Sequence, residues 1–455
     1  MFTIFSTLPA NRAIRKEFFK FAVPSVLGMV ISSLYTVVDG IFVGRGIGAL
    51  ALGSVNIVYP FIMLQIAIAM LLAIGGANLF SSSKGRKDFS RANNIFAQSM
   101  SILLAASLIF NFAAILFAEQ FCTMMGADET LLAGAANYLA WMALSGIIFM
   151  PGLGLSIFIR NDGAPKLEML GTLCGAVTNI ILDYFFIMRF GWGITGAAVA
   201  TGIGQWVSVA IYATHFRSPQ RTLRLTKPRF HLPEIAKIVY NGFSSFLMEF
   251  SQSAVALSFN IVIVARIGVA GISAYSVVMY ICSIFNMVLI GVVQGAQPII
   301  SYNHGCSNNK NVRSVYKMGV FSCLALSLFF YALIFIFGKN LAGLFSKDAN
   351  LVETAVQMMR CYFLGFFPVG VSLMSILYFQ ARSREAKSIL ISVLRCIGFV
   401  QLFLLILPGF FGAYGIYLSF FAGETCNCLI SMLLFRHDAF AKRRILIHRF
   451  SLIPR

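Results

Sequence analysis

The chain has 455 residues, of which 59% are hydrophobic and 11% charged, with a mean hydropathy of +0.84 and a net charge of +19. A soluble domain carries about 25% charged residues, so this composition excludes a soluble globular protein. Many apolar segments run past 18 residues instead of alternating over about ten, which predicts an integral membrane protein of the helical kind.

Cysteine placement and the amino-terminal segment set two further expectations. Most of the nine cysteines lie within apolar segments, and Cys426 and Cys428 lack metal-ligand spacing. We therefore expect neither a disulfide framework nor a cysteine metal site. The first apolar run is too long for a cleavable signal peptide and follows four basic residues, so we expect no cleaved leader.

Twelve apolar segments are predicted to span the membrane. In chain order they lie near 20–44, 49–80, 95–118, 132–159, 168–188, 193–215, 238–264, 271–301, 315–337, 354–380, 388–407 and 412–435. Both chain ends and the loops on their side hold 28 of the 35 lysines and arginines, whereas the opposite loops hold five. The positive-inside rule then predicts a multi-pass protein of the inner or plasma membrane with both termini in the cytoplasm. The basic charge serves topology and contact with membrane lipids, and no nucleic-acid partner is expected.

The second half of the chain repeats the first at an offset of 220 residues, as in the pairs Gly75/Gly295 and Gly85/Gly305. Because each copy contains six spans, an even number, both copies enter from the same side and are parallel repeats. This arrangement favours alternating access by rocking of two lobes, although a duplication kept for stability alone is the alternative. The predicted domains are an amino-terminal six-helix lobe (1–215), a cytoplasmic basic linker (216–237), a carboxy-terminal six-helix lobe (238–436) and a cytoplasmic basic tail (437–455).

Several motifs resemble those of the multidrug and toxic compound extrusion (MATE) family. They are Pro24, Val38-Asp39, Phe42-Val43-Gly44-Arg45, Gly48-Ala49-Leu50-Ala51-Leu52, Asn179 with Asp183, Gln294-Gly295-Ala296-Gln297-Pro298 and Ser301-Tyr302-Asn303-His304-Gly305. The resemblance covers nearly the whole chain. It implies an all-α membrane fold with twelve transmembrane helices in two pseudo-symmetric six-helix lobes, and a cation-coupled exporter, without naming a substrate.

Two carboxylates of the first lobe are the candidate coupling residues. A carboxylate at the centre of a spanning helix costs about 2.5–3.5 kcal/mol, so it usually has a task. Asp39 and Asp183 each lie about 7–8 Å below the outer ends of their spans, with Thr201 about 12 Å deep. Asn179 shares a helix face with Asp183. Four such oxygen-bearing side chains suit Na+, and two close carboxylates would equally hold one proton.

The resemblance places the ion site at these same four residues, so the coupling ion, H+ or Na+, is the only cofactor expected. The alternative is structural, with Asn179 and Asp183 bonding a broken backbone near Gly191-Trp192-Gly193.

The second lobe has embedded acids of a different kind. Arg395 and Glu424 lie at equal depth on successive spans, which predicts a structural ion pair. Glu249 would either share Arg395 or act in transport. Some family members use an acid on span ten, but here span ten offers Arg360 and no acid. Since the first lobe shows no membrane-embedded lysine or arginine, the coupling site is expected there.

A substrate cleft is expected between the lobes, because flexible methionines and tyrosines suit varied amphipathic ligands, although such stripes are also typical of packing. Its predicted residues are Met29, Tyr35, Met63, Gln65, Met150, Met248, Glu249, Tyr275, Met279, Tyr280 and Met287. Pro24 is the predicted hinge of the first span.

The sequence thus favours a monomeric antiporter that exchanges H+ or Na+ for amphipathic, often cationic drugs or metabolites. A lipid-linked precursor flippase of the same superfamily is the main alternative, although it would need more arginines or lysines in its cleft. An intramembrane enzyme lacks its expected motifs, HExxH and GxSxG, and a channel would not need a duplicated lobe.

Overall fold

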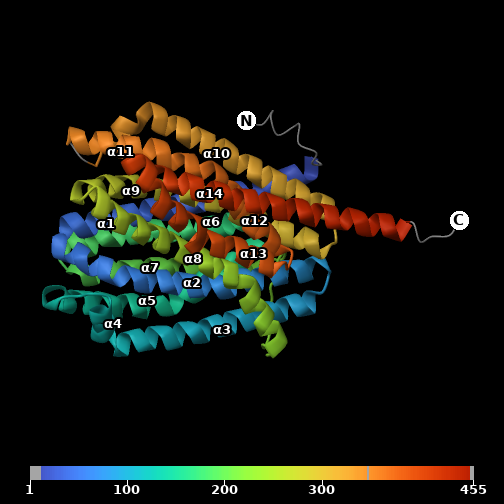
Figure 1. Ribbon diagram of the computed structural model, residues 1–455. Coiled ribbons are helices and arrows are strands. Elements are labelled where there is room, and N and C mark those ends of the chain that lie inside the picture. Colours follow the sequence, from blue (N-terminus) through green and yellow to red (C-terminus); the bar gives the residue numbers. More distant parts are fainter. Residues whose placement is uncertain (1–11, 346–347, 451–455) are drawn as a thin grey trace. The chain divides into compact units, whose positions relative to one another are not determined.

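The computed structural model describes residues 12–345 and 348–450 (Figure 1). Side chains are described for most of these positions, but not for 439–450. Of the predicted basic tail at 437–455, residues 451–455 lie outside the described residues, and side chains are described only at 437 and 438.

Helices account for every regular element of the described chain, which confirms the predicted all-α class. The elements are α1 (Arg12–Gly46), α2 (Ala49–Gly85), α3 (Phe89–Leu116), α4 (Ala118–Met124), α5 (Glu129–Asp162), α6 (Pro165–Asp183), η2 (Tyr184–Arg189), α7 (Gly193–Ala213), η3 (Thr214–Arg217), α8 (Leu232–Arg266), α9 (Val269–Gly305), α10 (Asn309–Gly343), α11 (Ala349–Tyr362), η4 (Phe363–Gly365), α12 (Phe366–Ala381), α13 (Glu385–Val393), η5 (Leu394–Gly398) and α14 (Phe399–Phe450).

Eleven helical segments of the described residues are long and apolar enough to cross a membrane. The predicted spans at 388–407 and 412–435 both fall in the last of these segments, Glu385–Asp438. Gly412 interrupts it with φ 56° and ψ −132°, a conformation that glycine adopts easily and other residues do not. The last segment therefore consists of two helices that meet at Gly412. Counting them separately gives the twelve predicted spans.

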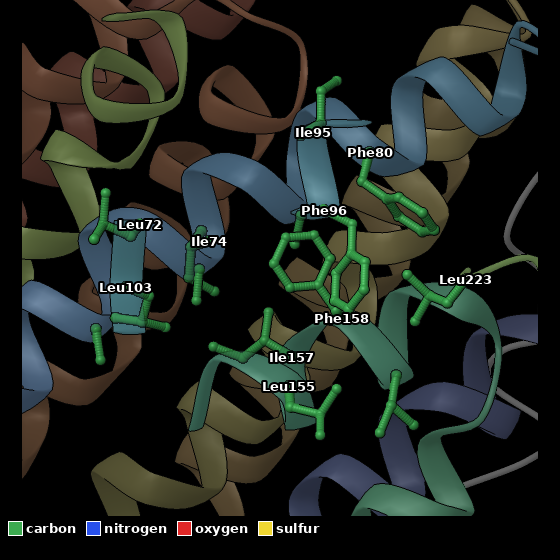
Figure 2. Close-up of a cluster of buried hydrophobic side chains, with 14 of the residues drawn as sticks. Leu72, Ile74, Phe80, Ile95, Phe96, Leu103, Leu155, Ile157, Phe158 and Leu223 are labelled. Atoms are coloured by element: carbon green, nitrogen blue, oxygen red, sulfur yellow. The ribbon is translucent and has the colours of Figure 1, made fainter. Parts of the chain in front are cut away.

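The chain groups into two compact units, the first of which runs up to Glu249 and includes Ile290–Val315. Within it α2, α3 and α5 pack side by side (Figure 1). Phe158 lies at the centre of their core, with its ring 5.8 Å from that of Phe80 and 5.0 Å from that of Phe96 (Figure 2). Leu223 of the predicted linker is fully buried against the same cluster, so the linker is part of this unit's packing.

Glycines let helices of this unit approach closely. A Cβ on Gly75 of α2 would lie 2.1 Å from the carbonyl oxygen of Ile238 on α8, and 2.8 Å from the nitrogen of Gly242. A Cβ on Gly295 of α9 would lie 2.5 Å from the Cα of Ala22 on α1. These contacts are equivalent under the 220-residue repeat.

A buried hydrogen-bond network accompanies them. Asn78 Nδ2 donates to Asn241 Oδ1 at 2.9 Å, while Gln297 Nε2 and Ser301 Oγ donate to Asn78 Oδ1 at 2.7 and 2.9 Å.

The second unit comprises Phe250–Leu289 and the chain from Tyr316 onward. Its α12 is almost wholly buried, and Tyr316 of α10 shares a 2.9 Å hydrogen bond with Ser375 of α12. Arg382, just after α12, bonds the side chains of Tyr378 and Asp438. The predicted lobe limits at 215 and 238 stay predictions.

Candidate functional site: a carboxylate pair in the first unit

Asp39 of α1 and Asp183, the last residue of α6, come together in the structure. Their carboxyl groups lie within hydrogen-bonding reach of each other, although 144 residues separate them in sequence. Asp183 is fully buried and Asp39 is half-buried. Both oxygens of Asp183 and one of Asp39 are shielded from solvent and have no hydrogen-bond donor of normal geometry among the described residues. Burial of unpartnered carboxylate oxygens is costly, so the pair is poised to take up a proton or a cation.

Asn179 and Thr201, the other two predicted coupling residues, lie beside the pair. Asn179 precedes Asp183 by one helical turn and donates from Nδ2 to Thr201 Oγ1 at 3.4 Å. The Thr201 hydroxyl donates in turn to the carbonyl of Ala197, one turn earlier on α7, at 3.0 Å. The Thr201 hydroxyl donates its proton to Ala197 and therefore keeps one lone pair beyond the one that accepts from Asn179. The Asn179 Oδ1 is buried without a hydrogen-bond donor among the described residues.

Two tyrosines complete the surroundings of the pair. Tyr35 of α1 and Tyr138 of α5 both lie within electrostatic range of Asp39 and Asp183. Tyr35 was predicted as a cleft residue, whereas Tyr138 was not predicted at all. Tyr138 lies nine residues after the start of α5 and Asp39 seven residues before the end of α1, so their similar depth was the signal that would have found it.

The chain after Asp183 explains how the site is shaped. Helix α6 changes there into the π-helical turn η2, a feature often found at functional sites. Gly191 and Gly193 then take φ values of 66° and 60°, which end η2 and start α7. The break is satisfied by backbone bonds, Phe190 N to Phe185 O and Trp192 N to Phe186 O, both 2.9 Å. Side chains of Asn179 and Asp183 make none of these bonds, so the alternative that they only hold the broken backbone finds no support.

Charge separates this pair from the other buried acids. Within the described part of the chain, Asp39 and Asp183 have no lysine, arginine or histidine within salt-bridge distance. The searched residues also hold no group of three or more histidine, cysteine, aspartate or glutamate side chains that would bind a metal ion. Two carboxylates with amide and hydroxyl oxygens fit a monovalent hard cation such as Na+, or a proton, better than a transition metal.

The second predicted group, Arg395 and Glu424, is also brought together. Arg395 Nε on η5 lies 2.7 Å from Glu424 Oε1 on α14, and both side chains are buried. Glu249 lies on α8 and is partly buried. Glu249 ends the first compact unit and Arg395 lies in the second, so the sharing of that arginine stays a prediction.

The predicted cleft residues take different positions. Met150 is fully buried in the core of the first unit, and Gln65 is buried with Nε2 2.5 Å from Asn111 Oδ1. Tyr275 is buried and stacks on Phe259, with 5.4 Å between ring centroids. Tyr280 is 59% exposed. The other predicted cleft residues are partly buried: Met29, Tyr35, Met63, Met248, Glu249, Met279 and Met287. The predicted hinge residue, Pro24, is buried and lies inside the continuous helix α1. The cleft itself stays a prediction.

Two further buried charge clusters were missed. Arg160 was assigned to a loop, but α5 continues to Asp162 and Arg160 is fully buried, 3.3 Å from Glu168 and 2.8 Å from Gln294. Helix α5 runs three residues past the predicted end of the span at 159, which brings Arg160 into its last turn. The expectation that the first lobe has no lysine or arginine within the membrane stays a prediction. Asp162 accepts bonds from Lys84 at 2.7 Å and faces His215 at 2.8 Å.

Comparisons with known proteins identify the family of the chain. The family model MatE matches residues 24–185 and again 245–407. Multidrug export protein MepA of Staphylococcus saprophyticus is 26% identical over 423 residues, covering 92% of this chain and 93% of the relative. MepA of Staphylococcus aureus strain MRSA252 is 26% identical over 426 residues, with the same coverage.

Solved structures share the fold. An outward-facing multidrug resistance MATE family transporter of the MOP superfamily has a TM-score of 0.90 at 21% identity, covering 95% of this chain and 97% of its own. A mutant of the Vibrio cholerae MATE transporter VcmN has a TM-score of 0.89 at 19% identity, covering 94% and 98%.

Proposed function

Because this chain belongs to the MatE family, we propose that it is an antiporter that exports amphipathic, often cationic small molecules in exchange for H+ or Na+. Relatives named as multidrug export proteins, which align over more than nine-tenths of the chain, support export of several compounds. They give no support to the lipid-linked precursor flippase. We place the protein as a monomer in the cell membrane, with both termini in the cytoplasm.

The observation that carries the proposal is the pair Asp39 and Asp183. Two carboxylates within hydrogen-bonding reach repel each other when both are ionised, and no basic side chain of the described residues offsets that repulsion. One cation or one proton between them removes it. The distance that α1 and α6 prefer is therefore shorter with the ion bound than without it. A ligand that favours one of two conformations in this way couples its binding to the conformational change.

Helix α1 is the element that would transmit the change. It carries Asp39 near one end and Pro24 in its interior, where the missing N–H leaves the carbonyl of Lys20 without its helical bond. A cation that enters from outside draws Asp39 toward Asp183, α1 bends at Pro24, and the ligand is released outward. The two lobes then return to the inward-facing state by rocking about the site.

The membrane potential supplies enough energy for this exchange. One positive charge that moves inward through 100 mV provides about 2.3 kcal/mol. That free energy sustains a gradient of roughly 50-fold for a neutral ligand.

The test is efflux of the cationic dye ethidium from proteoliposomes under a sodium gradient and, separately, under a proton gradient. We expect one gradient to drive efflux by the unmodified protein, and Asp39→Asn and Asp183→Asn each to reduce that rate at least tenfold. Glu119→Gln, at an exposed position of α4, is the matched control and should transport normally.

Both variants should melt within a few degrees of the unmodified protein in detergent, so that loss of efflux reports on coupling. Full efflux by Asp39→Asn and Asp183→Asn would remove the pair from the mechanism.

A further inference from the structure

The predicted linker is held on the outside of α3 by backbone and side-chain hydrogen bonds. Asp162 Oδ2 accepts from the backbone N–H groups of Thr222 and Leu223 at 2.9 and 3.1 Å. Asn93 Oδ1 on α3 accepts from the N–H of Arg224 at 2.7 Å. Residues 218–231, which we call the strap, therefore have a defined path over the helix.

The far end of the strap is fixed in the same way. Asn94 of α3 bonds Arg229 twice, from Arg229 N to Asn94 Oδ1 at 2.9 Å and from Asn94 Nδ2 to Arg229 O at 3.2 Å. Just beyond the strap, Glu234 forms an ion pair with Arg91 of α3 at 2.9 Å. A segment tied at both ends can present side chains in a fixed arrangement.

A cavity of about 220 Å³ lies between the strap and the helices. Its lining is mostly apolar and comes from three places, α3, α5 and the chain after α7: Phe96, Ala97, Met100, Ser101, Leu155, Phe216, Leu225 and Thr226. Farther along α3, Leu104, Ile109 and Phe112 are 45%, 73% and 52% exposed on a helix long and apolar enough to span the membrane. This exposed apolar face of α3 is one that lipid chains would cover, so the cavity lies on a helix that borders lipid.

Basic residues flank in sequence the two strap residues that line the cavity, Leu225 and Thr226. Arg221, Arg224, Lys227 and Arg229 of the strap are exposed, and they alternate with large apolar side chains. Leu225 is 77% exposed and Phe230 is 62% exposed. Two acids lie near this segment among the described residues, and both already have basic partners: Asp162 pairs with Lys84 and Glu234 with Arg91. Apolar side chains among basic ones are typical of a segment at the boundary between lipid chains and headgroups.

We propose that the strap and α3 form a binding site for an anionic phospholipid. One acyl chain fills the apolar cavity, and the phosphate headgroup binds the exposed guanidinium and ammonium groups of the strap. Charge complementarity favours an anionic headgroup over a zwitterionic one. The apolar cavity favours a lipid over free phosphate, which would use the basic side chains alone. The site is independent of what the protein transports.

The experiment uses the full chain in nanodiscs of phosphatidylcholine with one quarter phosphatidylglycerol. Native mass spectrometry after gentle release counts the lipids that stay bound. We expect the unmodified protein to retain phosphatidylglycerol in preference to phosphatidylcholine. Arg224→Gln with Lys227→Gln should reduce that retention at least fivefold. The matched control, Lys310→Gln with Lys317→Gln, removes two exposed charges elsewhere and should keep it.

Two further measurements distinguish a bound phospholipid from free inorganic phosphate. Ala97→Phe fills the cavity and leaves every charge in place, so it should also lower phosphatidylglycerol retention, with an unchanged melting temperature showing that it folds. Inorganic phosphate at about 10 mM, well below the physiological ionic strength of about 0.15 M, should not displace the lipid because it cannot use the cavity. Equal retention by the strap variant and its control would overturn the proposal. So would displacement by phosphate, or undiminished retention by a folded Ala97→Phe protein.

Discussion

Buried acids in the described chain fall into two groups according to their partners. Asp162, Glu168 and Glu424 each contact a basic side chain, at 2.7, 3.3 and 2.7 Å. Such pairs fix neighbouring helices to one another and resist change. Asp39 and Asp183 instead lie beside each other, without a basic partner within salt-bridge distance among the described residues. Two ionised carboxylates so close together repel each other, and this repulsion is the basis of the ion coupling that we propose.

The first prediction belongs to the Arg160–Glu168 pair. Replacing Glu168 by Gln removes the only carboxylate within salt-bridge distance of Arg160 among the described residues and leaves a buried positive charge. Losing one partner of a buried pair costs about 3 kcal/mol of unfolding free energy, so the melting temperature in detergent should fall clearly. Glu119→Gln, at an exposed position of α4, should melt like the unmodified protein. Equal melting temperatures for both variants would show that the ion pair contributes nothing to stability.

At the scale of elements, close helix packing in the first unit depends on small residues. Helices α2 and α8 meet at Gly75 and Gly242, and their repeat equivalents α9 and α1 meet at Gly295 and Ala22. The polar network around Asn78 lies among these helices and holds them by directed bonds. In the proposed cycle this packing must separate and form again, so it has to be tight without being covalent or strongly ionic.

The second prediction tests that packing through Gly242→Ala. A Cβ at this position would lie 1.7 Å from the carbonyl oxygen of Leu71, so α2 and α8 must move apart. We expect a lower melting temperature and a dye efflux rate reduced several-fold. Gly409→Ala in α14 is the matched control, because a Cβ there meets no atom within 4 Å. If Gly242→Ala transports and melts like Gly409→Ala, the close contact is not needed.

At the scale of the whole molecule, the distribution of basic residues predicts the orientation in the membrane. The strap, whose path along α3 the structure defines, carries four lysines and arginines within 14 residues. The turn between α4 and α5, at Gly126–Asp128, has none and ends in an acid that caps α5. Backbone and hydroxyl donors from Thr130 and Leu131 keep the pKa of Asp128 below its ordinary value. These opposite charges predict that the strap faces the cytoplasm and this turn faces outward.

The third prediction follows from that orientation. Alkaline phosphatase, which is active only outside the cytoplasm, is fused after Gly126 or after Ser218. The fusion at Gly126 should be active and the fusion at Ser218 inactive, with equal amounts of fusion protein verified by immunoblot. The reverse pattern would place the termini outside and would invert the direction proposed for transport.

Sequence alone determined the all-helical class, the approximate positions of the spans, the internal repeat and the two acids of the candidate site. These features depend on apolar run length and on the fixed rise of a helix, which are local properties that need no knowledge of neighbours. Tertiary structure alone decided that Tyr138 approaches Asp39, that Arg160 is buried against Glu168, and that the linker binds α3. Those contacts depend on which face of each helix packs against residues distant in sequence, and local sequence patterns do not specify those partners.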